Sequence, residues 1–90
     1  SILGLVGSPG AAAYTVSKHG VVGLTRAAVL DHAAEGIRVN AVCPGYIVTP
    51  MLERAGITTD PAVRDATIAL HPLGRLGRPE EVADTVLWLC

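Results

Sequence analysis

Tyr14 and Lys18 are the residues of this 90-residue chain whose types and spacing best suit proton transfer. In a helix, four residues make slightly more than one turn, so the two side chains would leave the same face. A phenol exchanges its proton reluctantly at neutral pH, and an ammonium group held beside it stabilises the phenolate. The pair therefore suits a general acid or base that acts on an oxygen atom.

Ser1 adds a third polar group, thirteen residues before Tyr14. A serine hydroxyl brought to the same place could hydrogen-bond a substrate carbonyl or alcohol oxygen. Together the three residues would move a proton on or off oxygen while a hydride moves elsewhere. That set is the minimum equipment for such a step, although a Tyr-x-x-x-Lys spacing alone is a weak signal.

Strand and helix patterns alternate along the chain and must position these residues. Gly36 is a suitable end for a long helix, Asp60 before Pro61 is a suitable start, and Pro79 before two glutamates opens the last helix. A continuous apolar stretch between helices is typical of a strand in a covered parallel sheet. The predicted order is strand end, loop, helix, strand, lid-like segment and helix, at residues 1–3, 4–10, 11–35, 37–43, 46–76 and 79–90.

This alternation predicts an α/β fold, part of a doubly wound parallel sheet of the Rossmann-like type. One strand and the end of another cannot satisfy each other's backbone groups, so we expect the fold to be incomplete in this chain. The helix over 11–35 is apolar around much of its circumference. We expect one of its sides to cover the sheet and the other to meet another subunit.

The composition excludes several classes of function. A net charge of −1 gives no excess of positive charge that would bind nucleic acid or an anionic membrane. No apolar run is long enough to span a bilayer. The first residues do not resemble a signal peptide, and Cys43 and Cys90 read as free thiols in a reducing compartment. We therefore expect a cytoplasmic protein. His19, His32 and His71 lack metal-ligand spacing, so no metal site is predicted.

Four stretches resemble the short-chain dehydrogenase/reductase family. They are Ser1 … Tyr14-Thr-Val-Ser-Lys18, Gly36-Ile-Arg-Val-Asn-Ala-Val-Cys-Pro-Gly45, Thr49-Pro-Met, and Pro72-Leu-Gly-Arg-Leu-Gly-Arg-Pro-Glu-Glu-Val-Ala83. The resemblance covers essentially all of residues 1–90 and corresponds to the C-terminal portion of the family's catalytic domain. It implies NAD or NADP as cofactor and a small-molecule alcohol or ketone as substrate.

The resemblance also implies catalytic roles. Tyr14 would be the general acid/base. Lys18 would assist it and hydrogen-bond the nicotinamide ribose, and Ser1 would hold the substrate oxygen. Tyr14 and Lys18 thus count among the cofactor-binding residues as well.

Further cofactor contacts are implied for the segment after residue 43. Pro44 and Gly45 would border the nicotinamide. Ile47, through its backbone, and Thr49, through its hydroxyl, would hold the carboxamide. The lid-like segment 46–76 would cover the substrate, and Arg75 and Arg78 are expected to have a structural role beside the last helix.

Some family features lie outside this chain. These are the glycine-rich dinucleotide turn, the residue that separates NAD from NADP, and the catalytic asparagine; Asn40 lies on the expected strand and is not that asparagine. We expect the isolated chain to be inactive. Two alternatives stay open beside a secondary-alcohol dehydrogenase: a 3-oxoacyl-thioester reductase, and a non-catalytic oligomerisation or regulatory protein. The family resemblance implies a homo-oligomer, tetramer or dimer, through the helix over 11–35.

Overall fold

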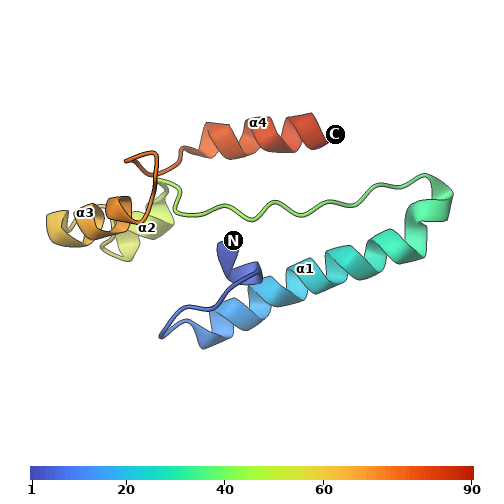
Figure 1. Ribbon diagram of the computed structural model, residues 1–90, viewed down its shortest axis with the longest axis horizontal. Helices are drawn as coiled ribbons and strands as arrows, with labels where there is room; N and C mark the ends of the chain where they lie inside the picture. The colour runs from blue at the N-terminus through green and yellow to red at the C-terminus, as the bar shows by residue number, and fades with distance from the viewer. The chain divides into compact units, whose positions relative to one another are not determined.

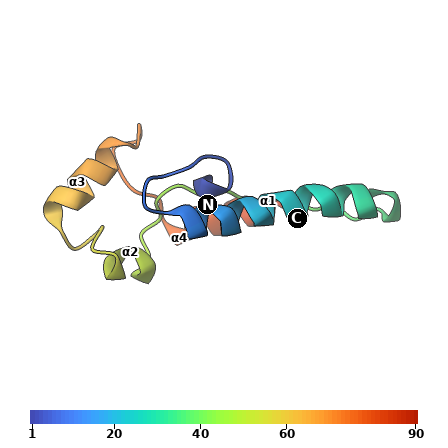
Figure 2. The same cartoon turned by 90° about the horizontal axis from the view of Figure 1, so that it is seen from below.

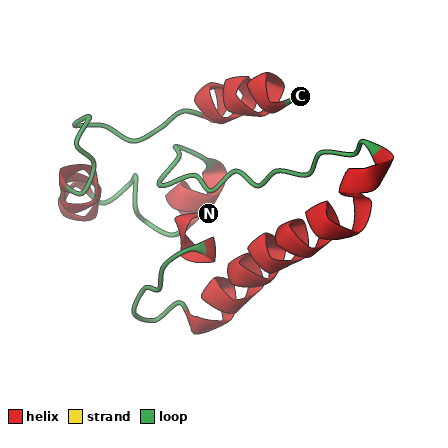
Figure 3. Cartoon of the chain, turned by 45° about the vertical axis from the view of Figure 1, so that its right-hand side comes forward, coloured by secondary structure: helices red, strands yellow, loops and turns green.

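The computed structural model describes all 90 residues as two compact units, Ser1–Cys43 and Pro44–Cys90. Helices and loops make up both units (Figures 1 and 3). None of the helices combines the length and the apolar character that crossing a membrane requires. The elements in chain order are η1 (Ile2–Gly4), α1 (Ala12–His32), η2 (Ala33–Glu35), α2 (Pro50–Arg54), α3 (Pro61–Ala69) and α4 (Pro79–Leu89).

The two predicted strands are absent from this structure. The expected strand end at residues 1–3 forms a 3₁₀ turn, in which the Gly4 amide donates to the Ser1 carbonyl at 2.9 Å. Residues 37–43 are drawn out without forming a strand (Figure 3). A strand is defined by hydrogen bonds to a neighbouring strand, and this chain provides no such neighbour. The chain is thus consistent with an incomplete Rossmann-like fold, as expected.

The long helix predicted over residues 11–35 is confirmed as α1 followed by the short turn η2. Gly36 ends it in the left-handed conformation, at φ 75°, which a residue without a Cβ adopts readily. Within this chain most of the apolar surface of the helix is uncovered: Leu24 and Leu30 are 70% and 85% exposed, and Val22 alone is buried. A helix with so much exposed apolar surface requires a covering surface.

In the second unit, a short backbone pairing joins the segment after Pro44 to the segment before α4. Ile47 and Gly77 form an isolated parallel bridge. The Gly77 amide donates to the Tyr46 carbonyl, and the Val48 amide donates to the Gly77 carbonyl, both at 2.9 Å. Figure 2 separates α2 from α3 and shows the turn between them, which belongs to the predicted lid-like segment.

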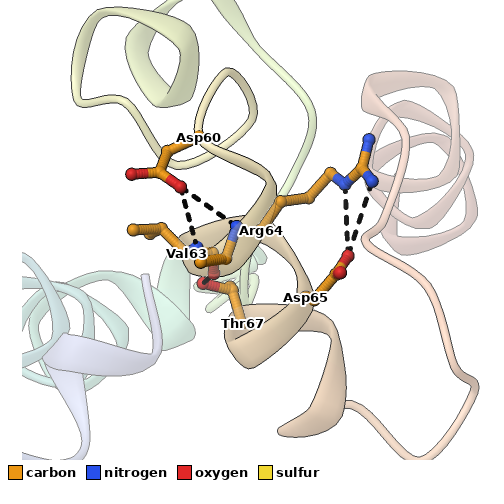
Figure 4. A network of polar contacts seen from close by, with 6 residues as sticks. Asp60, Val63, Arg64, Asp65 and Thr67 are labelled. Carbon is orange, nitrogen blue, oxygen red and sulfur yellow. Dashed lines mark hydrogen bonds and ion pairs between the residues drawn. The ribbon is translucent and has the colours of Figure 1, made fainter.

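Helix α3 begins where the sequence predicts. The Asp60 carboxylate accepts hydrogen bonds from the amides of Ala62 and Val63, at 3.0 and 3.4 Å (Figure 4). Pro61 at the first helical position removes an amide that would have no partner. Further along, the buried Thr67 donates its hydroxyl to the Val63 carbonyl at 2.8 Å. The start of this helix is therefore specified by local residues.

We expect Asp60→Ala to destabilise the full-length protein by about 1 kcal/mol, because two amides at the start of α3 lose their acceptor. Urea denaturation measures the change in the free energy of unfolding. Asp65→Ala is the matched control, since the exposed Asp65 carboxylate only pairs with Arg64 at 3.4 Å (Figure 4). An exposed ion pair of this kind contributes about 0–1 kcal/mol. Equal losses in the two variants would contradict the capping role.

Candidate active site

Tyr14 and Lys18 lie together on α1, as the spacing predicts. The Lys18 Nζ atom lies over the Tyr14 ring, 5.1 Å from its centroid. The tyrosine is 39% exposed and the lysine is half-buried, so the pair is accessible from solvent. A cation over an aromatic face at an exposed site contributes about 0.5–1 kcal/mol, which helps to hold the two groups next to each other.

The 3₁₀ turn η1 packs directly on the part of α1 that carries Lys18 (Figure 1). A Cβ atom added at Gly4 would lie 3.0 Å from the Lys18 carbonyl oxygen and 2.8 Å from Val22 Cγ2. The absence of a side chain at Gly4 therefore permits the close approach of the two elements. This packing places the turn that begins at Ser1 beside the helix that carries Tyr14 and Lys18.

Ser1 has a local structural role that the sequence did not predict. Its Oγ accepts a hydrogen bond from the Leu3 amide at 3.1 Å and so caps η1. A hydroxyl oxygen has a second lone pair and a proton to donate, so this bond leaves capacity for a ligand. Ser17 is turned to the backbone, where its hydroxyl donates to the Tyr14 carbonyl at 2.7 Å.

The residues predicted to contact the cofactor, apart from Tyr14 and Lys18, belong to the second unit. Thr49 is notable among them: its Oγ1 is buried and has no hydrogen-bond partner. Although Thr49 is the residue that precedes α2, its side chain does not cap that helix. A buried hydroxyl without a partner costs about 1–3 kcal/mol, so this atom suits a ligand with a hydrogen-bonding group such as an amide. The donor set therefore fits the carboxamide expected from the sequence.

The structure adds a cavity that the sequence did not reveal. It has a volume of about 210 Å³ and lies wholly within the second unit. Gly45, Tyr46 and Ile47 line it from one segment; His71, Arg75 and Glu81 are among the residues from the segments after α3. The predicted cofactor segment 44–49 therefore borders a cavity that also contains a histidine and an ion pair.

The ion pair in this cavity joins Arg75 to Glu81 in a two-pronged arrangement. The guanidinium donates to both carboxylate oxygens, at 2.9 and 2.6 Å, and the Arg78 amide donates to the same carboxylate at 2.8 Å. These bonds, the one from Arg75 above all, lower the pKa of Glu81 from 4.5 to about 2. The same contact raises the pKa of Arg75. The expected structural role of Arg75 beside the last helix is confirmed.

This pairing predicts an acid-sensitive contribution to stability. The folded-state pKa of Glu81 lies below its ordinary value, so the contribution is complete above about pH 4.5 and is lost as the pH falls towards about 2. Unfolding free energies measured across that window should fall less steeply in Glu81→Gln than in the unaltered protein. Glu80→Gln, on the neighbouring exposed residue, should keep the full slope. A Glu81→Gln slope equal to that of the control would refute the assignment.

Comparison with known proteins identifies the class. A family model described as Enoyl-(Acyl carrier protein) reductase matches residues 1–90. A cis-4-hydroxycyclohexanecarboxylate dehydrogenase from Sinomonas cyclohexanicum is 51% identical over 89 residues, which are 99% of this chain and 34% of that protein. A cyclohexanol dehydrogenase from an Acinetobacter species is 48% identical over 92 residues, 99% of this chain and 33% of that protein. The chain belongs to the short-chain dehydrogenase/reductase family.

Solved structures agree with this assignment. ElxO with NADP bound superimposes with a TM-score of 0.86 at 38% identity, over 99% of this chain and 36% of that one. A tyrosine-to-phenylalanine variant of ElxO with NADPH bound has a TM-score of 0.85 at 37% identity, with the same coverage. The chain thus spans about a third of the length of the relatives it matches.

Proposed function

We propose that residues 1–90 are the C-terminal portion of the catalytic domain of an NAD(P)-dependent oxidoreductase that interconverts a secondary alcohol and a ketone. The observation that carries the proposal is the position of Lys18 Nζ over the Tyr14 ring, on the helix against which the Ser1 turn packs. The relatives are named as dehydrogenases of alcohols, and the similar ElxO structures hold NADP or NADPH. Both findings support an enzyme over a non-catalytic protein.

In this proposal Tyr14 handles the proton on the substrate oxygen. During alcohol oxidation its phenolate accepts the hydroxyl proton, and the Lys18 ammonium stabilises the negative charge before that transfer. Ser1 donates a hydrogen bond that holds the substrate oxygen within reach of the phenol. The dinucleotide, when bound, supplies the hydride acceptor or donor.

The second unit would provide the remaining contacts to the dinucleotide. Pro44 and Gly45 border the nicotinamide, and Ile47 holds its carboxamide through the backbone. The unpartnered hydroxyl of Thr49 supports the assignment of this residue to the same carboxamide. The segment 46–76 would form the lid over the substrate. It contains the short helices α2 and α3, with a turn at residues 55–59 between them, and short elements of this kind can move as one loop.

The names of the relatives favour a ring alcohol as substrate. Two act on hydroxylated cyclohexanes, and a third, from Sphingobium indicum, is a 2,5-dichloro-2,5-cyclohexadiene-1,4-diol dehydrogenase, 45% identical over 99% of this chain. The description of the matching family model names instead an acyl thioester, the type of substrate in the 3-oxoacyl-thioester alternative, although an enoyl group is reduced at its carbon–carbon double bond and a 3-oxoacyl group at its ketone. The two candidates differ in whether the oxygen-bearing carbon lies in a carbocycle or in an acyl chain.

Steady-state assays of the full-length enzyme separate these candidates. We expect kcat/KM for cyclohexanol oxidation to exceed kcat/KM for reduction of an acetoacetyl thioester, with NAD and NADP each tested as cofactor. The reverse order would establish the thioester alternative. No turnover in either assay, together with no binding of either dinucleotide, would favour the non-catalytic protein.

We also propose that the full-length protein is a homo-oligomer and that it is cytoplasmic. The exposed apolar side chains of α1, Leu24 and Leu30 among them, favour a homo-oligomer, dimer or tetramer, built through residues 11–35. Light scattering of Leu24→Glu in the full-length enzyme tests this, with a smaller assembly as the expected result. A cytoplasmic location is proposed from the composition and the free thiols of Cys43 and Cys90.

A further inference from the structure

We propose that His71 is a positioning residue that holds the loop formed by Gly45 and Tyr46, and that it thereby sets the affinity for the dinucleotide. The second part rests on the proposed function, in which Gly45 borders the nicotinamide. The first part concerns this chain's own loop and can be tested with no cofactor present.

The imidazole of His71 is held by the end of α3. Its Nδ1 lies 2.8 Å from the Thr67 carbonyl oxygen. A carbonyl can only accept, so Nδ1 carries the proton in this contact. Thr67 is itself buried and hydrogen-bonded through its hydroxyl within α3. The ring is therefore fixed to a rigid helix on one side.

The other side of the ring borders the loop. A Cβ atom built on Gly45 would lie 3.6 Å from His71 Nε2, so the imidazole lies next to Gly45 across the cavity that both residues line. The next residue, Tyr46, places its ring edge-on to the imidazole, with centroids 5.7 Å apart and planes at 75°. Edge-to-face aromatic pairs at this separation are favourable. The imidazole thus contacts Tyr46 and lies beside Gly45.

The other groups around this loop differ from the imidazole in kind. Backbone pairing with Gly77 holds Tyr46 and Val48. Pro72 and Leu73 also line the cavity of about 210 Å³, but neither has an aromatic ring or a polar side chain, and Arg75 and Glu81 are engaged with each other. Loss of the imidazole would enlarge the cavity beside Gly45 and leave the loop free to shift into it.

Hydrogen exchange provides the first test. In the full-length protein without dinucleotide, we expect His71→Ala to accelerate amide exchange in residues 44–49 by about tenfold, because local opening of this loop becomes easier. His71→Phe keeps a ring beside Tyr46 but cannot donate to Thr67, and His71→Asn retains a donor at the position of Nδ1 but not the ring. Both should accelerate exchange less than alanine does.

The matched control is His19, an exposed histidine whose Nδ1 makes the same kind of bond, to the Thr15 carbonyl at 3.0 Å, without an aromatic partner. His19→Phe should leave exchange in residues 44–49 unchanged.

Dinucleotide binding provides the second test. Isothermal titration of the full-length enzyme with NAD(P) should show a dissociation constant raised about tenfold in His71→Ala, the order of a typical coupling between two sites.

Two results would overturn the proposal. One is unchanged exchange in residues 44–49 for all three His71 variants. The other is faster exchange throughout the protein, with kcat falling in the same proportion as the folded fraction, which would make His71 a packing residue only. If the unaltered protein binds neither dinucleotide, the proposed function fails. The exchange measurement would still show whether His71 restrains the loop of Gly45 and Tyr46.

Discussion

Tyr14→Phe should lower kcat of the full-length enzyme by about 10²- to 10⁴-fold, the contribution expected of a positioned general acid or base. The substitution removes the one atom that can take or give the proton, while the ring that carries Lys18 Nζ over its face stays in place. Dinucleotide affinity should therefore change little. Steady-state kinetics with a secondary alcohol, together with titration of the dinucleotide, measure the two effects separately.

Thr25→Val is the matched control for this experiment. It also removes one hydroxyl from α1 at nearly constant volume, and that hydroxyl only donates to the Val21 carbonyl of the same helix, at 2.8 Å. We expect kcat in this variant to stay within about twofold of the unaltered enzyme. Near-normal turnover of Tyr14→Phe, with the control also unchanged, would remove Tyr14 from the mechanism.

Lys18→Met should produce the second largest loss, with kcat lower by about 10²- to 10³-fold. Methionine keeps an unbranched side chain that is one atom shorter than lysine, and it removes the charge that stabilises the phenolate. Because Lys18 is also proposed to hydrogen-bond the nicotinamide ribose, KM for the dinucleotide should rise in the same variant. Initial rates measured over a matrix of alcohol and dinucleotide concentrations separate the two effects.

Arg26→Met tests whether any loss of positive charge from α1 has this effect. Arg26 is an exposed cation further along the same helix. Its substitution should leave both kinetic constants within about twofold, because long-range effects of an exposed charge are screened by salt. A loss in Lys18→Met no larger than the loss in Arg26→Met would show that Lys18 acts through the general field of the helix and not through Tyr14.

The helices could be predicted from the sequence because residues at their ends determine where they start and stop. Asp60 and Pro61 open α3, and Gly36 ends the long helix in the left-handed conformation. Helix α2 lies inside the predicted lid-like segment and was not predicted as a separate helix, although Thr49 and Pro50 are a pair of residue types that often starts a helix. A helix of five residues is too short to show a helical periodicity, so only the residues at its start could have predicted it.

The strands could not be predicted correctly from this chain alone. Residues 37–43 carry the apolar residues of a covered strand, yet no neighbouring strand is present to pair with them. The same holds for residues 1–3, which satisfy their backbone groups locally in η1, with Ser1 Oγ as the cap. Strand formation depends on partners distant in sequence, whereas a helix satisfies its own backbone.

Helical geometry, which is local, is the reason that the sequence by itself determined the pairing of Tyr14 with Lys18. Only the tertiary structure decided the contacts within each unit. In the first unit Gly4 brings η1 against the Lys18 carbonyl; in the second, Arg75 pairs with Glu81 and His71 contacts Tyr46. These contacts join residues separated by a loop or by whole helices, and their geometry depends on side-chain shape and burial. No spacing rule in the sequence encodes side-chain shape and burial. For this reason the sequence predicted the pairing of Tyr14 with Lys18 but not the contacts of His71.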